Sequence, residues 1–172
     1  MADVLGVLSD WAGKVPGILN WLLRLIYREE KIKKRVIVDM TSNKSANHVQ
    51  PLDDRNINFT LRIANFTPFK LTVENITLEF FWGHVTKKIC ENNFVEIEKC
   101  SEKNVFLRES LSSEEALKIV KAPNLKITEP RVGYRIDFSN RLYRFQKYGD
   151  LNNFGLEILN QEQALKKLSK PS

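Results

Sequence analysis

The stretch INFTLRIANFTPFKLTVENITLEFFWG, residues 57–83, decides the fold of this 172-residue chain. Its first part alternates apolar and polar residues, which predicts a half-buried strand. Pro68 ends that pattern, and a second alternating run extends from Leu71 to Trp82 with a change of phase near residues 74–75. A change of phase within a strand indicates a bulge or a bend. The apolar positions of the first run are Ile57, Phe59, Leu61 and Ile63.

Several shorter segments with the same alternation lie on both sides of this stretch. They cover residues 35–40, 85–90, 94–98, 104–108, 125–128, 132–138 and 142–148. Residues 41–54 are polar and predict a loop. Ser112 followed by acidic residues predicts a helix that runs to about Val120, and a second helix is expected over residues 156–168. Many short strands at regular spacing predict a mainly β protein with an antiparallel β-sandwich.

Residues 57–83 also resemble a known family. After the first strand comes an Asn65-x-x-Pro68 break, followed by a strand that ends in Trp82-Gly83. This pattern is similar to the start of the late-embryogenesis-abundant type-2 domain, also called the water-stress and hypersensitive-response domain. Residues 105–107, 111–114 and 132–138 fit later parts of that domain, so the resemblance covers about residues 35–151. The family bend is Asn-Pro-Asn-like, whereas here two residues separate Asn65 from Pro68.

The resemblance implies an immunoglobulin-like sandwich of seven strands. It brings no catalytic residues, because the family has none to carry over. Members are often tethered to membranes by an N-terminal hydrophobic segment, which matches the layout of this chain. We therefore expect three regions: an amphipathic helix with a basic connector at 1–34, a β-sandwich at 35–155, and a C-terminal helix and tail at 156–172.

Residues 3–28 have the periodicity of a long amphipathic helix. At about 100° per residue, their apolar side chains fall within an arc of about 160°. Three glycines and Pro16 make this helix poor in water, so it is expected to form on the surface that buries it, with a kink at Pro16. The predicted membrane or partner face comprises Val4, Leu8, Trp11, Val15, Leu19, Trp21, Leu22 and Ile26.

Three partners fit this helix. A lipid interface suits its aromatic residues and the basic run behind it. An apolar groove on another protein would bury the same face. Insertion across a bilayer as an oligomeric pore would use the small-residue ridge of Ser9, Gly13 and Gly17 for helix packing. The expected contacts with anionic headgroups are Arg24, Arg28, Lys31, Lys33, Lys34 and Arg35.

The formal net charge is +6, and a second basic region occupies residues 131–147. It mixes cations with aromatic rings, as single-strand nucleic-acid surfaces do. The alternative nucleic-acid face comprises Arg141, Tyr143, Arg144, Phe145 and Lys147. The simpler interpretation, which we prefer, is a pair of strands in which Val132, Tyr134, Ile136 and Phe138 face the core and Arg131 and Arg135 face water.

No motif of an enzyme occurs in the sequence. It contains no Gly-rich phosphate loop and no nucleophile elbow. His48 and His84 lack companions at metal-ligand spacing, so no metal or cofactor is expected. Cys90 and Cys100 are expected to be reduced, because no export signal precedes them. The sequence thus predicts a non-enzymatic protein, peripheral at the cytoplasmic face of a membrane, whose sandwich binds another protein; the alternative is a subunit of an assembly or a self-oligomer.

Overall fold

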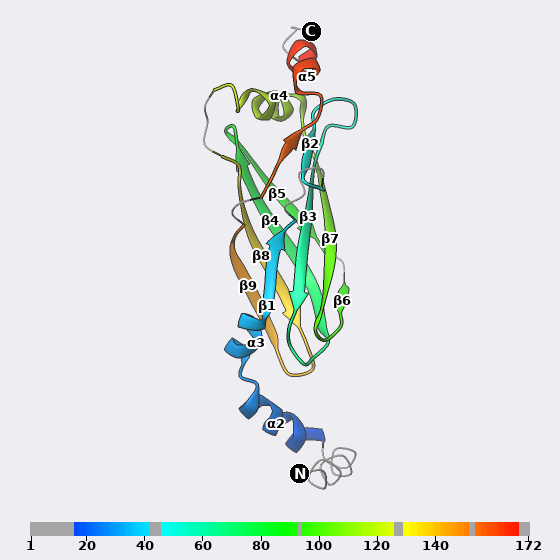
Figure 1. Ribbon diagram of the computed structural model, residues 1–172, viewed down its shortest axis with the longest axis vertical. Coiled ribbons are helices and arrows are strands. Elements are labelled where there is room, and N and C mark those ends of the chain that lie inside the picture. The colour runs from blue at the N-terminus through cyan, green and yellow to red at the C-terminus, as the bar shows by residue number, and fades with distance from the viewer. Residues whose placement is uncertain (1–15, 42–45, 93, 126–128, 152–153, 169–172) are drawn as a thin grey trace.

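Two five-stranded sheets form the body of the protein (Figure 1). The computed structural model describes residues 16–41, 46–92, 94–125, 129–151 and 154–168, and this part of the chain is mainly β. The first sheet consists of β1 (Val36–Met40), β2 (His48–Gln50), β3 (Asn56–Asn65), β7 (Ser101–Ser110) and β10 (Glu157–Ile158). The second consists of β4 (Leu71–Trp82), β5 (Val85–Glu91), β6 (Val95–Ile97), β8 (Arg131–Ser139) and β9 (Arg144–Leu151).

Each sheet is organised around one long strand. In the first, β7 pairs with the full length of β3, and β1 and β2 pair with successive halves of its other edge. In the second, β5 and β6 share one edge of β4, β8 occupies the other, and β9 lies outside β8. These pairings are antiparallel, whereas β10 adds to β2 in parallel. The two long strands are the ones that residues 57–83 predicted.

The core lies between the two sheets and follows the predicted alternation. The four apolar positions of β3 are fully buried, and Phe59 meets Phe80 of the opposite sheet with ring centroids 5.6 Å apart. The register of β4 against β8 shifts between Val73 and Asn75. This irregularity confirms the predicted bulge, and it lets both Val73 and Ile76 face the core although they lie an odd number of positions apart, with two residues between them.

The N-terminal region differs from the single long helix that the sequence predicts. Residues 1–15 lie outside the described part of the chain. From there, α2 (Pro16–Ile26) is an 11-residue helix, and a break at Tyr27 and Arg28 separates it from α3 (Glu29–Arg35). The predicted basic connector is therefore a helix. Ile32 explains this, because its side chain is only 1% exposed and packs in the core.

Other boundaries also differ from the prediction. The predicted loop at 41–54 contains β2, which pairs antiparallel with the next strand in the chain, β3. Leu125 lies in a turn, and the remainder of the strand expected at 125–128 lies outside the described residues. The predicted helix at 112–120 is confirmed as α4 (Ser113–Lys121), with Ser112 as its N-cap. The C-terminal helix α5 (Gln161–Leu168) begins later than predicted, because β10 occupies residues 157–158.

Candidate attachment surface at the α2 end

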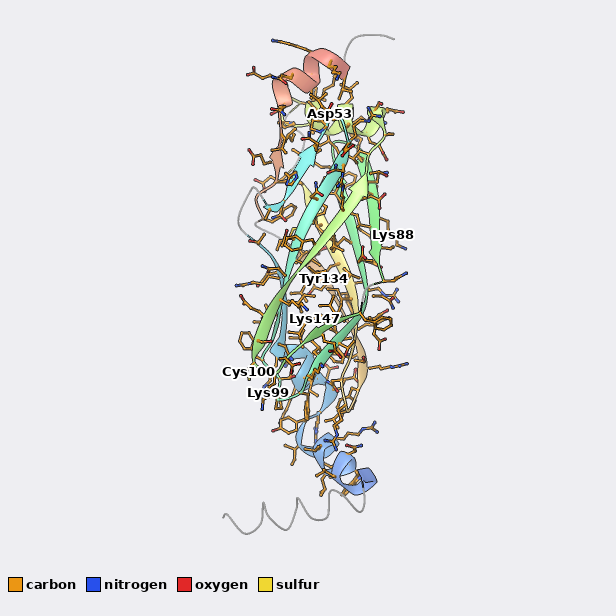
Figure 2. The ribbon with its side chains drawn as sticks, turned by 90° about the vertical axis from the view of Figure 1, so that its right-hand side faces the viewer. Asp53, Lys88, Lys99, Cys100, Tyr134 and Lys147 are labelled. Atoms are coloured by element: carbon orange, nitrogen blue, oxygen red, sulfur yellow. The ribbon has the colours of Figure 1, made fainter. Side chains whose placement is uncertain are left out.

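Helix α2 lies beyond one end of the two sheets, and α5 lies at the opposite end (Figure 1). The turn between β8 and β9 lies at the α2 end, as do Lys99 and Cys100, whereas Asp53 lies at the other (Figures 1 and 2). The predicted attachment residues that the structure describes, in α2 and α3, therefore lie at one pole of the molecule.

The polar face of α2 binds the β8–β9 turn. The Arg141 Nε donates to the Asn20 Oδ1 at 3.1 Å, and the Arg24 Nη2 donates to the Leu142 carbonyl oxygen at 2.9 Å. The Tyr143 hydroxyl donates to the Arg24 carbonyl oxygen at 3.3 Å, and the Arg24 guanidinium carbon lies 5.5 Å from the Tyr143 ring centroid. Asn140 shapes this turn, since its Oδ1 accepts from the amides of Leu142 and Tyr143.

The apolar face of α2 is left in water as a result. Trp21 is 60% exposed, Leu25 56% and Ile26 60%, and Leu22 is also exposed. Leu19 is half-buried. A helix that packed on its own domain in the usual way would bury these side chains and expose its polar ones. Here the polar side chains of Asn20 and Arg24 contact the domain, with Arg24 still exposed, and most of the apolar side chains face water. The apolar surface therefore remains available to a partner.

Of the other residues predicted for the membrane or partner face and for helix packing, only one is described by the structure. Gly17 is exposed, and a Cβ atom added there would meet nothing within 4 Å. The others lie outside the described residues: Val4, Leu8, Ser9, Trp11, Gly13 and Val15. No helix within the described ranges is long and apolar enough to cross a membrane.

Cationic side chains follow the apolar helix directly. Arg28, Lys31, Lys34 and Arg35 are exposed. Lys33 differs, because its ammonium lies 2.8 Å from the Glu29 carboxylate and 3.4 Å from that of Glu30. Its hydrogen bond with Glu29 raises the pKa of Lys33 above the usual value. Four of the six predicted headgroup residues therefore present their charge to solvent, whereas Lys33 and Arg24 are engaged within the protein.

The second basic region does not form one exposed face. Phe145 is only 5% exposed and stacks on Phe138 with centroids 5.4 Å apart, so the prediction that it could stack on a base was wrong. Lys147 is half-buried and donates to the carbonyl oxygens of Lys33 and Val36. Burial lowers the pKa of Lys147, and the nearby Asp39 partly opposes this effect. Arg141 and Tyr143 contact α2, and Arg144 is exposed near Glu74.

Other parts of the described chain offer little chemistry. No group of three His, Cys, Asp or Glu residues in the described ranges could hold a metal ion. His48 lies in β2 and His84 in the β4–β5 turn. Cys90 and Cys100 are free, exposed thiols. A hollow of about 360 Å³ on the second sheet is open and is lined by residues of both charges, including Lys88, Arg135 and Asp150.

Sequence reasoning missed the contacts that hold α2. The helical periodicity puts Asn20 on the polar side of the helix but gives no sign of its contact with Arg141. Nor does it indicate that the Tyr27 ring meets the Phe69 ring edge-on at 5.2 Å. These contacts join residues more than 40 positions apart, so no local pattern indicates them. The one sequence feature that points to these contacts is the polar side of the amphipathic helix, because water or a polar segment of the protein must cover it.

Comparisons with known proteins leave the family open. No family model matches the chain, and no curated protein matches it. Among solved structures, a structural-genomics target is 9% identical, with a TM-score of 0.44 over 70% of this chain and 88% of that one. A protein from Archaeoglobus fulgidus is 14% identical, with a TM-score of 0.39 over 67% of this chain and 93% of that one. Likenesses at this level carry no argument about function.

Proposed function

We propose that this protein is a non-enzymatic, membrane-associated β-sandwich protein that attaches to an anionic lipid surface through α2 and the basic residues after it. One observation carries the proposal. The polar side of α2 is bonded to the β8–β9 turn through Asn20 and Arg24, while Trp21, Leu25 and Ile26 face solvent. The chain thus holds an apolar helix face outward.

Burial of that face supports attachment on energetic grounds. A large apolar side chain gains about 1.5–3 kcal/mol when it is fully removed from water. An amphipathic helix gains part of this free energy when it lies in the plane of the membrane interface, with its apolar face at the boundary between headgroups and acyl chains. Trp21 suits that level, because its ring is apolar and its N–H is polar.

The charge distribution favours lipid over a protein groove. Arg28, Lys31, Lys34 and Arg35 are exposed immediately after the apolar helix. Each basic residue near an anionic membrane contributes about 1 kcal/mol, and the effect falls off within a Debye length. An apolar groove on a protein would need a separate acidic rim to use these four charges.

The strand pairing supports an immunoglobulin-like form of the sandwich. Strands β1, β3 and β7 pair in the order expected of strands A, B and E, and β4, β8 and β9 in that of C, F and G. This is the arrangement that the late-embryogenesis-abundant type-2 resemblance implies, and membership of that family stays a prediction. In this proposal the sandwich presents its far end to a protein partner at the cytoplasmic face of the membrane.

Co-sedimentation of the full chain with neutral and anionic vesicles tests the proposal. We expect the chain to pellet, and more strongly with anionic vesicles. A double variant, Trp21→Ser with Leu25→Ser, should remain in the supernatant. Phe106→Ser is the matched control, since Phe106 is 76% exposed on β7, away from α2.

A parent chain that stays in the supernatant with both kinds of vesicle would contradict attachment to lipid. The apolar face would then belong to a protein groove or to a second copy of the chain. Measurement of the mass of the purified protein without lipid distinguishes these two, because self-association depends on protein concentration.

A further inference from the structure

We infer that the turn between β3 and β4, residues 66–70, is a second membrane contact, in which Phe66 enters the same anionic lipid surface as α2. The inference rests on the proposed function and adds a second, separate point of contact. It would fix how the sandwich stands on the membrane, because two contacts restrict the tilt that a single helix leaves open.

The turn is held by a buried hydrogen-bond network centred on Asn65. The Asn65 side chain is fully buried. Its Oδ1 accepts from the Thr67 amide at 3.1 Å and from the Thr67 hydroxyl at 2.6 Å. Its Nδ2 donates to the carbonyl oxygens of Phe69 at 2.8 Å, Ile97 at 3.2 Å and Glu98 at 3.0 Å. The network ties the β3–β4 turn to the β6–β7 turn and fixes its backbone.

This fixed backbone holds an aromatic residue outward. Asn65 and Thr67 are both buried, and the residues that follow each of them, Phe66 and Pro68, are exposed. Phe66 is 53% exposed. An apolar side chain on a rigid turn loses little conformational entropy on binding, so most of its burial energy is available for contact.

The position of Phe66 links it to the basic helix. Its amide donates to the Arg35 carbonyl oxygen at 2.9 Å, directly at the end of α3. On the other side of the turn, the Phe69 ring meets Tyr27 at the end of α2. Arg35 and Lys99 are exposed cations at this pole, of the kind that an anionic membrane favours. Within the turn, the Lys70 ammonium lies 2.6 Å from the Glu96 carboxylate and 3.6 Å from that of Glu98.

Exposure alone does not qualify a residue for this role. Phe106 is more exposed than Phe66, but it lies opposite Thr60, halfway along the length of β7. Ser101 pairs with Asn65 at the α2 end, five residues away, which is about 17 Å along a strand. Phe106 therefore serves as a matched control of the same residue type.

The test compares Phe66→Ser and Phe106→Ser in the full chain, with the lipid concentration for half-maximal pelleting on anionic vesicles as the readout. We expect Phe66→Ser to raise that concentration about threefold to tenfold and Phe106→Ser to leave it within about twofold. Phe66→Trp should restore binding, and its fluorescence should be quenched by lipids brominated in the acyl chain. Phe106→Trp should show no quenching beyond that of the parent.

Each outcome separates the two proposals. If the parent pellets while both Ser variants behave alike, or Trp at position 66 is quenched no more than at position 106, the second contact is overturned and attachment by α2 stands. If the parent does not pellet, the proposed function fails, and this inference fails with it. Thermal unfolding without lipid checks that Phe66→Ser leaves the fold intact, as expected for a side chain that lies half in water.

Discussion

The Lys147 ammonium donates a hydrogen bond to the Lys33 carbonyl oxygen at 3.2 Å, so an outer strand of the second sheet holds the end of α3. The same group also donates to the Val36 carbonyl oxygen, where β1 begins. Because the protein partly removes this charge from water, burial lowers the pKa of Lys147. Lys147 thus adds a contact from β9 to those that join α2 and α3 to the sandwich.

Lys147→Met should therefore destabilise the protein although it keeps an apolar stem. The substitution leaves the carbonyl oxygens of Lys33 and Val36 without this donor, and we expect a loss of about 1–3 kcal/mol in the free energy of unfolding. Chemical denaturation measures it. Lys88→Met, at an exposed position of β5, should change the stability by less than about 0.5 kcal/mol. Equal effects of the two substitutions would contradict the role of Lys147.

Asn65→Ala should be among the more damaging single substitutions. It removes five hydrogen bonds in a fully buried environment and leaves three carbonyl oxygens without that donor. We expect a loss of about 2–4 kcal/mol, measured by chemical denaturation. Asn75→Ala provides the comparison, because Asn75 is exposed and its side-chain amide donates to the Asp137 carboxylate at the protein surface. A loss at Asn65 no larger than at Asn75 would show that the network does not fix the turn.

The two central residues of the β4–β5 turn differ in what they tolerate: position 83 requires glycine, whereas position 84 accepts a side chain. Gly83 has φ of 59° and His84 has φ of 61°, as in a two-residue type I′ hairpin. A Cβ atom at Gly83 would approach the Ala122 Cβ and the Lys118 carbonyl oxygen at 2.9 Å, whereas His84 is exposed. Gly83→Ala should lower the free energy of unfolding by at least about 1–2 kcal/mol. His84→Gly should leave the free energy of unfolding unchanged or raise it. Thermal unfolding of both variants checks this, and the reverse order would be inconsistent with the turn geometry.

Helix α4 has a pH-dependent contribution from its capping box. Burial alone would raise the pKa of Glu115, but hydrogen bonds from the Ser112 amide and hydroxyl and from Lys87 outweigh it and lower the pKa below the usual value. Because the folded-state pKa is the lower one, the carboxylate stabilises the fold above about pH 4.5, and this contribution is lost as the pH falls through the folded-state pKa.

Glu115→Gln should therefore lower the free energy of unfolding by about 1 kcal/mol near neutral pH. The difference in this free energy between variant and parent should become smaller in acid. Denaturation at several pH values measures it. Glu114→Gln serves as the control, since the Glu114 carboxylate is exposed and pairs with Lys118 within one turn of helix. A difference for Glu115→Gln that did not change with pH would exclude the proposed titration.

The sequence predicted most of the sheet positions, because alternation is a local signal that survives folding. It did not predict α3, although Glu29 and Glu30 at its start and Lys33 to Arg35 at its end match the helix dipole. It could not predict β2, whose three residues depend on pairing with β3. The same limit applies to the attachment surface. The exposed face of α2 follows from periodicity, whereas the meeting of α2 with Arg141 and Tyr143 depends on contacts across about 120 positions.

Lys147 also affects whether two copies of the protein can pair through their β9 strands. Among the described residues β9 is the outermost strand of its sheet, and its free backbone edge could pair with another chain. A protein held on a membrane meets its own copies far more often than one in solution. A second copy that added a strand there would shield the inward-pointing ammonium further from water, at an electrostatic cost. If the protein attaches to a membrane as proposed, Lys147 would thus also discourage neighbouring copies from joining edge to edge through β9.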